Sequence, residues 1–107
     1  MISRHWKGVA RLEKADSYID HLRRDTFPKL SKIRGFIGAS ILRRVVSQGV
    51  EFLVVTDWES LDAIREFAGE KPEVAVVPPV VQAMMVAYDK ETRHYEVVEK
   101  SDARVGS

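Results

Sequence analysis

The stretch Phe52-Leu53-Val54-Val55-Thr56-Asp57-Trp58 narrows the possible folds of this chain more than any other segment. Its residues favour a β-strand, in which successive side chains point to opposite faces of a sheet. One face receives Phe52, Val54 and Trp58, and the other receives Leu53 and Val55. A strand with one solvent-exposed face would alternate apolar and polar residues. This strand therefore needs cover on both of its faces.

The length of the chain limits what can provide that cover. With 107 residues, it is long enough for one domain with a modest core. Its helices suffice to cover one face of a small antiparallel sheet, but not two. We therefore expect the second apolar face to pack on another copy of the chain in a homodimer. We predict a single domain over residues 1–100 and a flexible polar tail over 101–107.

Hydrophobic periodicity and turn residues divide the chain into four strands and two main helices. Strands are expected at 2–10, 36–46, 50–58 and 92–99, with a hairpin turn at 47–49. Helices are expected from 15 to Phe27, where Pro28 should end or kink the first one, and at 61–68. Ser60 is the expected N-cap of the second, and Gly69 its stop. Short helical turns are expected at 74–77 and 80–86, where the valines leave a strand open as an alternative.

The order strand, helix, strand, strand, helix, strand is the split βαβ arrangement of ferredoxin-like α+β folds. In that arrangement a four-stranded antiparallel sheet carries its helices on one face. The other face, with the second apolar set of the 50–58 strand, is left for a partner chain. Two such sheets can then pack face to face.

Composition excludes several classes of function. The chain has 17 Lys and Arg against 16 Asp and Glu, a net charge of +1, so no overall field attracts it to nucleic acid or anionic lipid. It has no cysteine, which excludes disulfides and thiolate sites and fits a reducing cytoplasm. No apolar run reaches membrane-spanning length, and the N-terminus lacks the apolar segment of a signal peptide. We expect a cytoplasmic protein that binds neither nucleic acid nor membrane.

Short motifs occur along nearly the whole chain: Arg4-x-Trp6-x-Gly8, Phe27-Pro28, Gly35-Phe36-x-Gly38, Trp58-Glu59-Ser60-Leu61, Phe67-Ala68-Gly69 and His94-Tyr95-Glu96-Val97. Together they resemble the antibiotic biosynthesis monooxygenase family of the dimeric α/β-barrel superfamily. The Trp-Glu-Ser junction is the most specific of these motifs. The resemblance implies a homodimer with a pocket between helices and sheet in each protomer.

The resemblance also implies a function. Some members of the family oxidise polycyclic phenols or quinols with molecular oxygen and without metal or flavin. By that likeness, this chain is a cofactor-independent monooxygenase-like protein that acts on an aromatic or quinone-like small molecule. The alternative is a non-catalytic small-molecule-binding or stress-response protein with the same pocket. The alternative is favoured by the lack of asparagine, whose amide family members use, and by the small number of acid–base groups.

Other members of the family degrade heme. Matching the chain to them through the second helix puts Phe67 at the position of a tryptophan and Val77 near that of the heme-ligating histidine. The chain therefore lacks the residues that the resemblance would require for heme degradation. We expect heme to bind only weakly.

Three residues are the leading candidates for chemistry. His94 is the candidate acid–base or substrate-orienting group, because an unperturbed imidazole titrates near neutral pH. Arg4 and Trp6 lie two residues apart on one strand and so share a face. An arginine that faces inward needs an anionic ligand or a carboxylate such as Glu96 or Asp57.

Further candidates for the pocket wall are Tyr18, Met84 and Tyr88. The tyrosine of the first helix can project its hydroxyl into the cavity, and methionine is an adaptable wall residue. No metal site is expected, because a His5–His94 pair has no carboxylate partners at ligand spacing. His21 is expected to be solvated on the polar side of the first helix.

Overall fold

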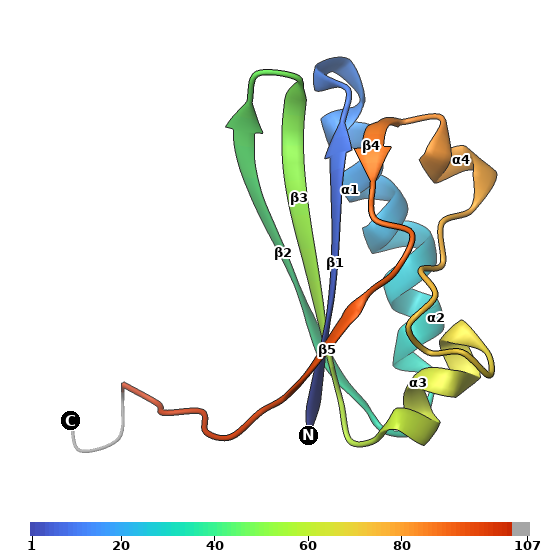
Figure 1. The fold of residues 1–107 in the computed structure, drawn as a ribbon, viewed down its shortest axis with the longest axis vertical. Helices are drawn as coiled ribbons and strands as arrows, with labels where there is room; N and C mark the ends of the chain where they lie inside the picture. Colours follow the sequence, from blue (N-terminus) through green and yellow to red (C-terminus); the bar gives the residue numbers. More distant parts are fainter. Residues whose placement is uncertain (104–107) are drawn as a thin grey trace.

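The computed structural model describes residues 1–103, so 104–107 of the predicted tail lie outside the described residues. Its strands are β1 (Ile2–Ala10), β2 (Phe36–Val46), β3 (Gly49–Trp58), β4 (Met85–Tyr88) and β5 (Arg93–Glu96). They form one antiparallel sheet in the order β2-β3-β1-β4, and β5 also pairs with β1. The helices lie together on one side of this sheet (Figure 1). The predicted ferredoxin-like α+β class is confirmed.

The edge of the sheet beside β1 differs from the prediction. β4 pairs with Gly8–Ala10, and β5 pairs with Ile2–His5 of the same strand. The edge therefore consists of two short strands, and the sheet has five strands rather than four. The segment expected to form turns at 80–86 divides into helix α4 (Pro79–Gln82) and β4. Proline at the first turn favours α4, because its fixed φ suits a helix start.

The first helix widens ahead of Pro28 instead of ending there. A 3₁₀ turn, η1 (Leu12–Lys14), leads into α1 (Ala15–His21), the π-helical segment η2 (Leu22–Thr26) and α2 (Phe27–Ser31). Pro28 has no N–H to donate to the preceding turn, and its ring crowds the carbonyl four residues earlier. The wider turn accommodates this, since the Phe27 N–H bonds to Leu22 O, five residues back. The expected disturbance at Phe27 is present, but the chain stays helical.

The second predicted helix, α3, covers Leu61–Ala68. The Ser60 Oγ accepts a hydrogen bond from the Ala63 N–H at 3.2 Å, as an N-cap does. Gly69 follows with a φ of 89°, a conformation that side chains other than glycine rarely adopt. Both predicted ends of this helix are confirmed.

The helix-covered face of β3 forms the centre of the core. Phe52 and Trp58 are completely buried there. The Trp58 ring packs edge-on against Phe36, with ring centroids 5.2 Å apart, and stacks on Phe67 at 6.4 Å. Its indole N–H donates to the Thr56 Oγ1 at 2.8 Å. This tryptophan joins the sheet to α3.

The opposite face of β3 carries the second apolar set. Leu53 and Val55 are half-buried, and within residues 1–103 no helix covers them (Figure 1). Leu42 lies opposite Leu53 in the register and is 49% exposed. Leu42, Leu53 and Val55 form an apolar patch on this face, beside Lys7 and His5 of β1. An exposed apolar patch on an uncovered sheet is typical of an interaction site.

We predict that this face packs on a second copy. Sedimentation velocity at micromolar concentration should show a dimer, whose interface should bury at least about 1,200 Å². Replacing Leu53 with glutamate places a charge in that interface and should give a monomer. The control is Val80→Glu on the helix side, where the valine is also exposed and the dimer should persist. A monomeric unmodified chain would contradict the prediction.

No helix in the described part of the chain is both long and apolar enough to cross a membrane.

Candidate functional site

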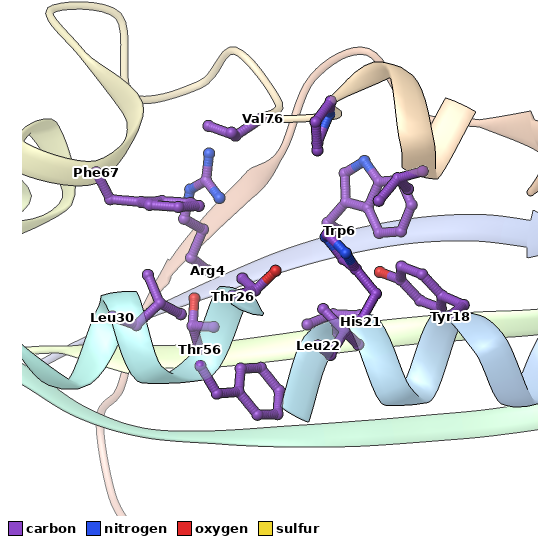
Figure 2. A pocket seen from close by; sticks show the side chains of 14 residues that line it. Arg4, Trp6, Tyr18, His21, Leu22, Thr26, Leu30, Thr56, Phe67 and Val76 are labelled. Carbon is purple, nitrogen blue, oxygen red and sulfur yellow. The ribbon is translucent and has the colours of Figure 1, made fainter. Parts of the chain in front are cut away.

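A cavity of about 60 Å³ lies between the helices and the sheet, with 14 residues around it (Figure 2). Most of its wall is apolar, with side chains from β1, β3, the long first helix, α3 and the segment before α4. Polar atoms enter it from Arg4, Tyr18, His21, Thr26 and Thr56. An apolar cavity with a few converging polar groups is the usual form of a small-molecule site.

Arg4 is the charged group of this cavity. It faces the helices because alternate residues of β1 point to that side. Its side chain is held in the segment before α4, where Nη2 donates to the carbonyl oxygens of Pro72 at 3.2 Å and Val74 at 3.1 Å. The guanidinium carbon also lies 5.6 Å from the centroid of the Phe67 ring. These contacts fix the arginine at one end of the cavity (Figure 2).

The charge of Arg4 has no carboxylate partner within residues 1–103. Asp57, a partner considered from the sequence, pairs instead with Lys100 at 3.0 Å, and Glu96 forms no ion pair with the arginine. Arg4 is only 6% exposed, and this burial lowers its pKa to about 10, so it remains a cation at neutral pH. A buried cation that is bonded only to neutral carbonyls is a strong attractor for an anion.

Trp6 and Tyr18 form an aromatic wall next to the arginine. The Trp6 indole N–H donates to Asp89 O at 2.8 Å, and its ring lies 6.0 Å from that of Tyr18, centroid to centroid. Burial raises the pKa of Tyr18, so its hydroxyl stays protonated. Figure 2 shows this hydroxyl turned toward the cavity, where it can donate a hydrogen bond to a ligand.

His21 also lines the cavity, although the sequence predicted a solvated side chain. The prediction of solvation is wrong: the side chain is only 14% exposed. Its Nε2 lies 3.7 Å from Asp25 Oδ2, and that carboxylate also binds Lys29 at 3.1 Å. The spacing of residues in the helix could have predicted this position. His21 follows the buried Tyr18 by three residues and therefore lies beside it on the same face of the helix.

His94 lies outside the lining of this cavity. It pairs with Arg4 across β1 and β5 and so faces the same side of the sheet, but it lines a separate surface depression with Glu59 and Glu96. Its Nε2 is buried and has no hydrogen-bond partner within residues 1–103. Burial, followed by the charge of Arg4, lowers the pKa of His94, so the imidazole is neutral at neutral pH. Its catalytic role stays a prediction, and it competes with the role proposed below for His21.

The remaining candidates occupy different places. Met84 and Tyr88 pack against the core beside Trp6 and are not among the cavity-lining residues. His5 points to the opposite sheet face from His94, where its Nε2 lies 2.9 Å from the Ser3 Oγ. The described residues contain no cluster of three or more side chains suited to hold a metal ion.

Comparison with known proteins identifies the fold. No family model matches the chain, and no curated protein matches it in sequence. Solved structures do match it. A point mutant of SnoaB, a cofactor-independent oxygenase from Streptomyces nogalater, shares 12% identity at a TM-score of 0.64, over 92% of this chain and 94% of that one.

Two further structures are similar over nearly the whole chain. The heme-degrader MhuD from Mycobacterium tuberculosis, with two hemes in its active site, has 18% identity and a TM-score of 0.60, over 95% of this chain and 100% of that one. A Bacillus cereus protein named as an antibiotic biosynthesis monooxygenase has 18% identity and a TM-score of 0.64, over 96% of both chains. Other matching structures carry the same family name, so the resemblance expected from the sequence is confirmed for the fold.

Proposed function

We propose that the protein is a cofactor-independent monooxygenase-like enzyme that acts on an aromatic or quinone-like small molecule in the helix–sheet cavity. The observation that carries this proposal is Arg4, a buried cation on the wall of an apolar cavity that has no carboxylate partner among the described residues. Such a charge favours a ligand with an anionic oxygen. The fold shared with SnoaB, which is named as a cofactor-independent oxygenase, supports the choice of reaction.

Different residues of the cavity can take different roles in the oxidation of a phenol. A phenol that loses its proton donates electrons to oxygen; one oxygen atom replaces a ring hydrogen to give a quinone, and the other leaves as water. Arg4 would hold the phenolate oxygen, and His21 would accept the proton. Trp6 and Phe67 would pack against the ring.

The proposal includes assembly and location. The uncovered apolar face of the sheet supports a homodimer, and the lack of cysteine supports the cytoplasm.

Heme is a poor fit for this cavity. A volume of about 60 Å³ is far below the several hundred cubic ångströms of a typical pocket for a drug-sized ligand. Phe67 is part of the wall, but Val77 is not, and His21 is the imidazole among the lining residues. These features support a smaller ligand.

Oxygen uptake tests the proposal. The protein, treated with a chelator and without added flavin, should consume oxygen faster than autoxidation alone when given a panel of single-ring hydroquinones. A single observation favours the non-catalytic alternative: the cavity offers one imidazole and no carboxylate among its lining residues. Ligand binding without oxygen uptake across the panel would contradict the enzyme and leave the ligand-binding alternative.

A further inference from the structure

The hydrogen bonds of Arg4 restrict the anion that it can bind. A guanidinium has five N–H donors, two of them on Nη2. Both Nη2 hydrogens have acceptors in the protein, the carbonyl oxygens of Pro72 and Val74. A carboxylate binds an arginine best through two parallel N–H groups on neighbouring nitrogens, and both such pairs of a guanidinium include Nη2. Arg4 therefore has no free pair of parallel N–H groups with which to bind the two oxygens of a carboxylate.

The remaining donors of Arg4 are Nε and Nη1. Nε is shielded from solvent and has no hydrogen-bond partner, and Nη1 has none among residues 1–103. The N–H bonds of Nε and Nη1 are not parallel, so these two donors cannot bind both oxygens of one carboxylate. Since Arg4 lines the cavity, Nη1 is the donor left to face a ligand. It suits a single anionic oxygen.

The size of the cavity restricts the rest of the ligand. About 60 Å³ is less than half of the roughly 150 Å³ that encloses a benzene molecule in an engineered protein cavity. One ring therefore already requires some outward movement of the wall, and fused rings require more. Val76 and Pro78 lie in the segment before α4, outside the sheet, where the neighbouring Ala75 N–H donates to Lys90 O at 2.9 Å and Val77 O accepts from Gln82 at 2.8 Å. This part of the wall is neither strand nor helix, so we expect it to be the part that shifts.

We propose that the ligand of the cavity is a single-ring phenol bound as its phenolate, with its one anionic oxygen on Arg4 Nη1. The side chains of Trp6 and Phe67 pack against the ring, and the site discriminates against carboxylates and fused-ring phenols. This inference rests on the proposed function for the place of the ligand, and adds the chemical class.

A set of probes of similar size tests the inference on the unmodified protein. Calorimetric titrations at pH 8 would compare 4-nitrophenol, 4-nitrobenzoate and nitrobenzene, with 1-anthrol as the fused-ring probe. The phenolate should bind at least about tenfold more tightly than each of the others, which is about 1.4 kcal/mol. The absorption band of 4-nitrophenolate should shift on binding. Equal or tighter binding of 4-nitrobenzoate or 1-anthrol would overturn the inference.

Variants of Arg4 test whether this residue causes the preference for the phenolate. Arg4→Lys keeps a cation but loses the loop contacts, whereas Arg4→Met removes the charge and should abolish the preference for 4-nitrophenolate over nitrobenzene. Arg43→Met, on an exposed arginine of β2, is the matched control and should keep it. A preserved preference in Arg4→Met would overturn the assignment. If both Arg4 variants fail to fold, the probe series on the unmodified chain still decides.

The outcomes separate this inference from the proposed function. Tight phenolate binding without any oxygen uptake keeps the ligand class and removes the enzyme. Oxygen uptake on quinols together with a preference for 4-nitrobenzoate keeps the enzyme and removes the ligand class.

Discussion

Replacing His21 with alanine is expected to lower oxygen consumption on a suitable quinol by about a hundredfold or more, the usual contribution of a positioned general base. His21 is the imidazole that lines the cavity, and Asp25 lies 3.7 Å from its Nε2. The measurement is the initial rate of oxygen uptake at saturating quinol. The helix should stay intact, because alanine favours helices and the histidine is not part of the core clusters.

His94→Ala is the matched control for this prediction. His94 was the acid–base candidate from the sequence, but it lies outside the cavity lining. We expect its alanine variant to keep most of the oxygen uptake. A large loss in His94→Ala together with unchanged turnover in His21→Ala would reverse the assignment and return the catalytic role to His94.

Replacing Trp58 with alanine is expected to lower the free energy of unfolding by about 3–5 kcal/mol, the range for large aromatic residues removed from a core. Trp58 is completely buried between the sheet and α3, against Phe36 and Phe67. Its removal leaves a cavity and an unpaired Thr56 hydroxyl. Urea denaturation followed by circular dichroism measures the change.

Two further variants are the controls for the Trp58→Ala measurement. Thr56→Val removes the hydrogen bond to the indole and should cost about 1 kcal/mol, which separates that bond from the packing. Leu12→Ala, at an exposed position in η1, should change the free energy of unfolding by less than about 0.5 kcal/mol. A loss below about 1 kcal/mol in Trp58→Ala would mean that the sheet–helix junction contributes little to stability.

Local patterns in the sequence predicted most of the fold. The period of two in Phe52–Trp58 identified a strand with two apolar faces, and the structure has helices on one of them only. Ser60 and Gly69 marked the ends of α3. These features are readable because each depends on residues only a few positions apart, through side-chain alternation, capping and glycine's access to positive φ.

The candidate site depends on contacts between residues that are far apart in the sequence, and local sequence patterns do not predict such contacts. Arg4 bonds to carbonyl oxygens 68 and 70 residues away, in a segment whose path no local period specifies. Pro28 forced a wider helical turn, and the packing of the first helix on the sheet brought His21 to the cavity. The division of the edge into β4 and β5 left His94 beside Arg4 but outside the cavity lining. Alternation along a strand predicts which face a side chain occupies; which side chains meet on that face depends on how the loops and helices pack over it.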